Sequence, residues 1–234
     1  MSDQITRKEL KHDVVPFSLE HSFDYIAANK SQITKYGGAI VAVLLIVGLG
    51  LYYRNYQVAA REQALGDAIA LQNAPVGQAP PNGGPSFPTD AAKKDAIVKA
   101  YTKLMTEHAG SSEAYIAEYT LGAMDAENGK LTEARKKFQE VSDNGNADYA
   151  SMARLALAQI AFAEDKNDEA KKILKELADK PTAMVSKNQA NFVLARGIAA
   201  KEPAEARKIL VALADTKSEI SQVAVTALSE IPPQ

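Results

Sequence analysis

The chain has 234 residues, of which 46% are hydrophobic and 24% charged, and its formal net charge is -2. This balance is typical of a globular protein, and without a basic excess we do not expect a nucleic-acid partner. The chain has no cysteine, which excludes disulfide bonds, thiolate nucleophiles and cysteine zinc sites.

Residues 1–35 are predicted to form an arm that ends in an amphipathic helix. The segment is polar as far as Pro16, and Ser18 is then placed to cap a helix. Apolar side chains follow at helical spacing, namely Leu19, Phe23, Ile26, Ala27 and Ile33. We expect this helix to lie on a membrane surface or to dock on a partner, and the alternative is a simple lead-in to the next segment.

Residues 36–53 are predicted to form a transmembrane helix. The run YGGAIVAVLLIVGLGLYY contains no charged residue and is bounded by Lys35 and Arg54. As a helix it would rise about 27 Å, close to the hydrocarbon thickness of about 30 Å. A cleaved signal peptide and a buried core helix are the alternatives, but the long preceding segment and the absence of polar periodicity disfavour them.

The distribution of basic residues predicts the orientation of this helix. Five precede it and two follow within twenty residues, namely Arg7, Lys8, Lys11, Lys30 and Lys35 against Arg54 and Arg61. The positive-inside rule therefore places the N-terminus in the cytoplasm and the larger part of the chain outside, at an inner (cytoplasmic) membrane. Gly38 and Ala42 form a small-xxx-small pair that could seat another membrane helix, or they could simply face lipid.

Two connecting segments are expected after the span. Residues 54–73 are rich in good helix formers and are predicted to continue the helix as a stalk. Residues 74–90 contain five prolines and three glycines, which predicts a flexible or extended linker.

Residues 91–234 contain an internal repeat. The pattern AEYTLG at 117–122 recurs as ARLALA at 153–158 and ANFVLA at 190–195, at spacings of 36 and 37 residues. A second pattern follows at a spacing of 36 residues: Ala134, Phe138 and Val141, then Ala170, Leu174 and Leu177, then Ala206, Leu210 and Leu213. Two apolar patterns locked to one period predict an all-α fold, an α-solenoid of about three helix pairs. Flanking helices are expected at 95–108 and 219–231.

No pattern in the chain indicates catalysis. The histidines His12, His21 and His108 are far apart and none has a ligand partner at metal spacing. There is no nucleophile elbow and no glycine-rich phosphate loop outside the apolar run. We therefore expect a protein that is not an enzyme and that uses neither a cofactor nor a metal.

The residues Leu121-Gly122, Gly129, Ala134 and Phe138 resemble the tetratricopeptide repeat in order and spacing. Together with the N-terminal span, the chain resembles the YfgM-like family, ancillary components of the SecYEG translocon. The resemblance implies a groove lined by the first helix of each pair. Carried over to this sequence, the groove residues are Tyr119, Met152, Leu155, Gln159, Phe162, Gln189, Phe192 and Arg196. Several of these, Leu155 above all, could instead belong to the packing between helices.

Two functions follow from this reading. The first is a membrane-anchored protein-binding module near the export machinery, with translocon subunits, periplasmic chaperones or exported chains as partners. The second is a structural scaffold of a cell-envelope assembly or division complex, in which the groove holds one fixed partner. Broad capture of unfolded chains would favour the first, and stoichiometric binding of one folded protein would favour the second.

Overall fold

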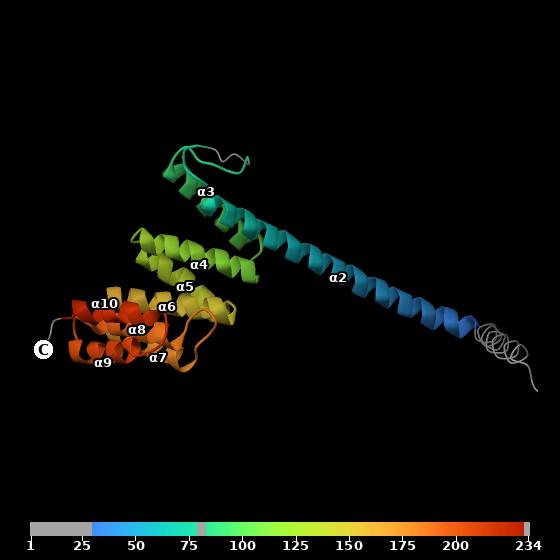
Figure 1. The fold of residues 1–234 in the computed structure, drawn as a ribbon. Helices are drawn as coiled ribbons and strands as arrows, with labels where there is room; N and C mark the ends of the chain where they lie inside the picture. The colour runs from blue at the N-terminus through green and yellow to red at the C-terminus, as the bar shows by residue number, and fades with distance from the viewer. Residues whose placement is uncertain (1–29, 79–82, 232–234) are drawn as a thin grey trace, which may run out of the picture. The chain divides into compact units, whose positions relative to one another are not determined.

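The structure is a computed structural model that describes residues 30–78 and 83–231. Within these residues the regular elements are all α-helices, as the sequence predicts (Figure 1). They are α2 (Lys30–Asn73), α3 (Asp90–Glu107), α4 (Ser112–Glu127), α5 (Leu131–Asn144), α6 (Ala147–Ala163), α7 (Asn167–Asp179), α8 (Lys187–Ile198), α9 (Pro203–Ala214) and α10 (Ile220–Glu230). The predicted amphipathic helix lies almost entirely outside the described residues and stays a prediction.

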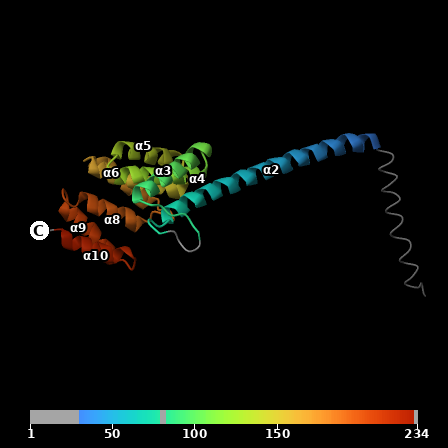
Figure 2. The same cartoon turned by 90° about the horizontal axis from the view of Figure 1, so that it is seen from above.

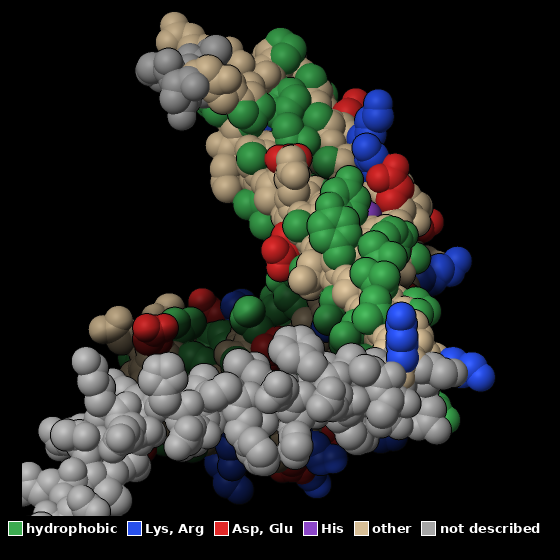
Figure 3. Space-filling view, turned by 90° about the vertical axis from the view of Figure 1, so that its right-hand side faces the viewer, with side chains coloured by type: hydrophobic (Ala, Val, Ile, Leu, Met, Phe, Trp, Pro, Cys, Tyr) green, Lys and Arg blue, Asp and Glu red, His purple; other side chains and the backbone are tan. Residues whose placement is uncertain are grey.

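Helix α2 contains the predicted span and is long and apolar enough between Thr34 and Asn73 to cross a membrane. Its apolar side chains are uncovered, with Leu45 61% and Ile46 70% exposed. Hydrophobic side chains are prominent on the face of the molecule shown in Figure 3. The helix of a soluble core would bury such side chains, so the exposure fits a lipid-facing helix better.

The chain divides into two compact units, one ending at Ala59 and the other beginning at Ala60. The predicted repeat domain begins at residue 91, so the compact unit starts earlier than the sequence suggested. Residues 60–73, assigned to a separate stalk, are the first helical turns of this C-terminal unit. The difference arises because their alanines and leucines pack against helices that come later in the chain.

The end of α2 packs against α3 and α4. Ala68 is fully buried in a cluster with Ile97, Tyr101 and Leu121. The hydroxyl of Tyr101 donates a hydrogen bond of 2.9 Å to Oε1 of Gln72. Arg61 on α2 lies 3.6 Å from the carboxylate of Glu113 on α4. These contacts make the last turns of α2 and the whole of α3 a helix pair that precedes the three predicted pairs.

The proline-rich segment 74–90 connects the two helices of this first pair. Its ends are tied together, because the amide of Gly77 donates to the carbonyl of Phe87 at 2.8 Å and the amide of Phe87 donates to the carbonyl of Pro75 at 3.1 Å. Gly77 has a φ of 97°, a conformation that favours glycine. The described part of the segment is therefore a loop between packed helices and differs from the spacer that its composition predicted.

Helices α4 to α9 form the three predicted pairs, and α10 follows as a single helix. Successive helices pack side by side from α3 to α10 (Figures 1 and 2). We call α4, α6 and α8 the A helices of the repeats and α5, α7 and α9 the B helices, with α10 as a final A-type helix. The A helices of the repeats begin with side-chain caps from Ser111, Asn146 and Ser186.

Small residues allow each A helix to approach its B helix. A Cβ on Gly122 would lie 3.0 Å from Cε1 of Phe138, so this helix pair has no room for a larger residue there. Ala158 and Ala195 occupy the same place in the later pairs and are fully buried. They share their clusters with Leu174 and Leu210, which are smaller than Phe138. The first helix pair therefore combines a glycine with a phenylalanine, and the two later pairs combine an alanine with a leucine, so that a larger residue on one helix meets a smaller one on the other.

The turns within the first two repeats use the left-handed backbone region. Gly129 between α4 and α5 has a φ of 75°, and Asp165 between α6 and α7 has a φ of 65°. Aspartate is among the few side chains that adopt this conformation readily. Helices α4 and α6 end at these two turns.

Basic residues spaced by 36 positions on the B helices connect successive repeats. Arg135 on α5 forms ion pairs of 2.7 Å with Glu164 and 2.8 Å with Glu169. Lys171 on α7 pairs with Glu202. Arg207 on α9 donates to the carbonyl of Ile231 at 2.7 Å. Acidic residues at the turns and helix starts are therefore ion-pair partners of a basic residue in the preceding repeat.

Replacing Arg135 by glutamine is expected to lower the free energy of unfolding by about 1 kcal/mol, because two partly exposed ion pairs are lost together. Urea unfolding followed by circular dichroism should show this loss at low salt and a smaller one at high salt. Lys175→Gln on α7 is the matched control, because Lys175 is exposed and the described residues give it no ion-pair partner. Equal midpoints for the two variants would contradict the role of Arg135.

Glu118 on α4 predicts a pH dependence of stability. Burial raises the pKa of its carboxyl, the nearby carboxylate of Glu140 raises it further, and Lys137 opposes the shift. The folded chain thus holds this proton more tightly than the unfolded chain, so stability is lost as the pH rises from about 4 through the folded pKa. Glu118→Gln should raise the urea midpoint at neutral pH and reduce its fall between acidic and neutral pH. Glu62→Gln, at an exposed site, should change neither.

Candidate functional site

The A helices line a row of hollows at the junctions between repeats. The junction 1 hollow lies between α4, α5 and α6 and has a volume of about 320 Å³. The junction 2 hollow lies between α6 and α8 and also has about 320 Å³. The junction 3 hollow lies between α8, α9 and α10 and has about 290 Å³. One hollow of similar volume therefore lies at each junction between successive A-type helices.

The three hollows are lined by equivalent positions. Ala126, Phe162 and Ala199 follow one another at spacings of 36 and 37 residues and occupy the same place at junctions 1, 2 and 3. The facing position on the next A-type helix is Ile160, then Gly197, then Ile231. The repeat pattern thus includes these lining positions as well as the core positions. The three junctions differ in the sizes of the side chains at these positions.

The Phe162 ring lies on α8 at junction 2. An ideal Cβ on Gly197 would lie 2.1 Å from Cε2 of the Phe162 ring, so the ring lies directly on the backbone of α8. At junctions 1 and 3 the sizes are exchanged, because Ala126 and Ala199 stand at the place of Phe162, and Ile160 and Ile231 at the place of Gly197. The three hollows accordingly have similar volumes.

A further hollow of about 650 Å³ lies where α8 and α10 begin, below the loop that follows α7. Gln189 and Phe192 line it from α8, and Ile220 and Val223 line it from α10. Met184 contributes from the loop and is 50% exposed. Its lining is mixed, with several serine and amide side chains beside the apolar ones.

Six of the eight predicted groove residues line these hollows. Tyr119 and Gln159 line junction 1, and Gln159, Phe162, Phe192 and Arg196 line junction 2. Arg196 also lines junction 3, and Gln189 lines the hollow between α8 and α10. The structure thus brings residues that are far apart in the sequence onto one side of the A helices.

The other predicted groove residues, Met152 and Leu155, lie elsewhere. Both are partly buried against the core cluster that contains Leu174 and Val185. This placement corresponds to packing between helices, the alternative that the sequence left open for Leu155. In the other unit, the predicted helix-contact residues Gly38 and Ala42 are exposed on α2, and nothing lies within 4 Å of a Cβ on Gly38.

Tyr119 forms part of the floor of junction 1. Its ring centroid lies 5.3 Å from that of Phe138 and 5.9 Å from that of Tyr149, in tilted and edge-on geometry. Burial raises the pKa of the Tyr119 hydroxyl, and the neighbouring Tyr149 adds to the shift. The hydroxyl therefore stays neutral at physiological pH, and the floor of the hollow carries no charge.

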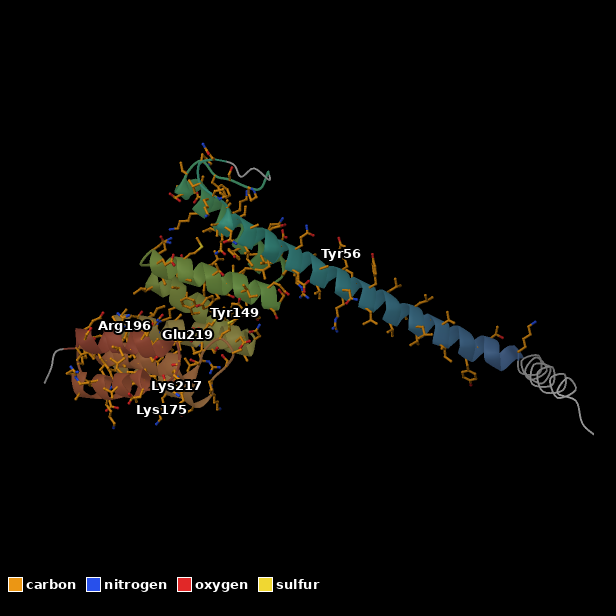
Figure 4. The ribbon with its side chains drawn as sticks, viewed as in Figure 1. Tyr56, Tyr149, Lys175, Arg196, Lys217 and Glu219 are labelled. Atoms are coloured by element: carbon orange, nitrogen blue, oxygen red, sulfur yellow. The ribbon has the colours of Figure 1, made fainter. Side chains whose placement is uncertain are left out.

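Charged side chains at the rims differ between junctions. Glu127 is the one charged residue that lines junction 1, whereas Arg196 and Glu230 both line junction 3. Glu127 and Arg196 are exposed, and within the described part of the chain neither forms an ion pair. Figure 4 shows Arg196 on the C-terminal helices, with Lys175 of α7 toward their opposite edge.

The sequence reasoning missed the residues that shape the hollows, namely Ala123, Ala126, Ala156, Ile160 and Gly197. The alternation of small and large residues at one repeat position could have indicated them. Among the described residues, no three His, Asp or Glu side chains lie close enough together to hold a metal ion. The arrangement can hold apolar side chains of another molecule, with polar and charged groups at the edge.

Stacked helix pairs of about 36 residues, with a row of hollows along their A helices, define a helical-repeat protein of the interaction-module class. The family model described as a tetratricopeptide repeat-like domain matches residues 30–190. The chain belongs to this family. No curated protein and no solved structure matches the chain.

Proposed function

We propose that this protein is a membrane-anchored binding module for other proteins and has no catalytic activity of its own. The row of hollows along the A helices carries the proposal, because it offers apolar recesses with Gln159 and Arg196 at their rims. Such a surface suits polypeptide side chains, which combine apolar and polar contacts over an extended length. The family supports it, since tetratricopeptide-like repeats suggest protein partners.

The membrane anchor is the uncharged stretch of α2 at 36–53. Its length and the exposure of its apolar side chains support a span, and the excess of basic residues before it supports a cytoplasmic N-terminus. The C-terminal unit then lies outside the cytoplasm. Since that unit begins at Ala60, its first helix pair starts about two helical turns beyond Tyr53 along α2.

We propose the export machinery as the partner, on the resemblance to the YfgM-like family. The span would contact translocon subunits through Gly38 and Ala42. The hollows would receive segments of exported chains or of periplasmic chaperones before these have buried their own apolar side chains. Binding without strict sequence choice suits this role, because each hollow is small and open.

Photocrosslinking in cells tests the proposal. A photoreactive residue at Gln159 probes the hollows, one at Gly38 probes the span, and one at exposed Lys175 on α7 is the matched control. We expect exported chains or chaperones at Gln159, translocon subunits at Gly38, and neither at Lys175. Recovery of a single folded envelope protein at both probes would replace this function by that of a structural scaffold.

A further inference from the structure

We propose that the junction 1 hollow is a pocket for one aromatic side chain of the partner polypeptide, next to a lysine or arginine of the same segment. The inference deepens the proposed function, because it states the chemistry of the segment that the module binds. It depends on the apolar lining of the junction 1 hollow and on the charge at its rim.

The first argument is that an aromatic side chain can lie between two successive A helices. At junction 2 the ring of Phe162 lies on the backbone of Gly197. At junction 1 the two sizes are exchanged, because Ala126 stands at the place of Phe162 and Ile160 at the place of Gly197. A hollow of about 320 Å³ remains beside Ala126, and a ring brought by a partner would enter there.

The second argument concerns the walls of the junction 1 hollow. Phe138 and Ile160 are 2% and 5% exposed and form an apolar floor with Tyr119. Ala123, Ala126, Ala156 and Ala163 supply methyl groups, and the polar lining is limited to Gln159 and Glu127. An aromatic ring would remove this apolar surface from water, gaining edge-on contact with Tyr119 as well.

The third argument is charge complementarity. Glu127 is the only charged side chain in the lining of junction 1, and it is exposed without an ion-pair partner among the described residues. A lysine or arginine beside the inserted ring would meet this carboxylate at the rim. Junction 3 is also open, but Arg196 and Glu230 at its rim carry opposite charges and favour neither sign.

Labelled hexapeptides test the inference on the full chain in lipid nanodiscs. The probe is Gly-Ser-Phe-Lys-Ser-Gly, and two comparison peptides replace its Phe by Ala or its Lys by Glu. Fluorescence anisotropy measures each affinity. The Phe-Lys peptide is expected to bind at least about tenfold more tightly than the Ala-Lys peptide, as burial of one aromatic side chain requires.

Two variants locate the binding. Ala126→Phe adds a ring beside Ile160 that would fill the junction 1 hollow, so the preference for Phe should disappear, and thermal melting checks that the fold is kept. Ala212→Phe, on the exposed side of α9, is the matched control and should leave binding unchanged. Glu127→Lys should reverse the preference between the Lys and Glu peptides.

The inference is overturned if Ala126→Phe melts like the unchanged chain and still prefers the Phe peptide, or if Glu127→Lys keeps the original charge preference. Its failure is distinguishable from failure of the proposed function. Crosslinks from Gln159 to exported chains would remain in the first case, whereas they would be missing in the second even if the hexapeptide binds.

Discussion

Replacing Phe138 by alanine is expected to lower the free energy of unfolding of the C-terminal unit by about 3–4 kcal/mol. Phe138 is 2% exposed and lies among Ala134, Val141 and Leu157. Its ring also lies over Gly122, where a Cβ would be 3.0 Å from Cε1 of the ring. The variant would leave a cavity bordered by two helix pairs.

Urea unfolding of the full chain in detergent, followed by far-UV circular dichroism, measures this loss. Val211→Ala is the matched control, because Val211 is 47% exposed on α9 and its truncation should cost less than about 0.5 kcal/mol. Replacing Gly122 by alanine together with Phe138→Leu should recover much of the stability, since the later repeats use that pair. A loss below about 1 kcal/mol for Phe138→Ala would contradict the packing described for the first repeat.

Replacing Gly197 by valine is expected to cost about 2–3 kcal/mol, because the new side chain would occupy the place of the Phe162 ring. Phe162 is partly buried and packs against two core clusters, and it would lose these contacts if it moved away. The same substitution in a chain that already carries Phe162→Ala should cost almost nothing. The two residues are therefore expected to show strong energetic coupling.

A double-mutant cycle of unfolding free energies measures this coupling. Gly66→Val on α2 serves as the comparison, because nothing lies within 4 Å of a Cβ at that helical glycine. Its cost should be the same in both backgrounds. Additive losses for Gly197→Val and Phe162→Ala would show that the ring does not lie on Gly197.

The repeat architecture could be predicted because its signals are local. Apolar residues at helical intervals, locked to a period of 36 residues, predict the helices from α4 to α10. Gly122 allows a close approach of two neighbouring helices, and Gly129 adopts the left-handed backbone conformation of a turn. Both roles depend on residues nearby in the sequence. The uncharged run at 36–53 is an equally local signal for a span.

The beginning of the folded unit could not be read in the same way. Proline and glycine composition at 74–90 suggested a spacer, but that composition suits a loop that turns between packed helices just as well. The burial of Ala68 against Tyr101 shows that residues 60–73 belong to the folded unit. These two residues lie on opposite sides of the proline-rich segment in the sequence. No local pattern in residues 60–73 distinguishes a free stalk from the first helix of a repeat.

In the candidate site, too, some features follow from the sequence and others only from the tertiary structure. The sequence by itself determined the helices and the period, because these follow from spacing along the chain. Its resemblance to the tetratricopeptide repeat placed Tyr119, Gln159, Phe192 and Arg196 in a groove along the A helices. Only the tertiary structure decided that Met152 and Leu155 pack inward and that Phe162 lies on Gly197 while Ala126 leaves a hollow open. Whether a space between two helices is filled depends on side-chain sizes contributed by both, and residues about 36 positions apart reveal that only when the fold brings them together.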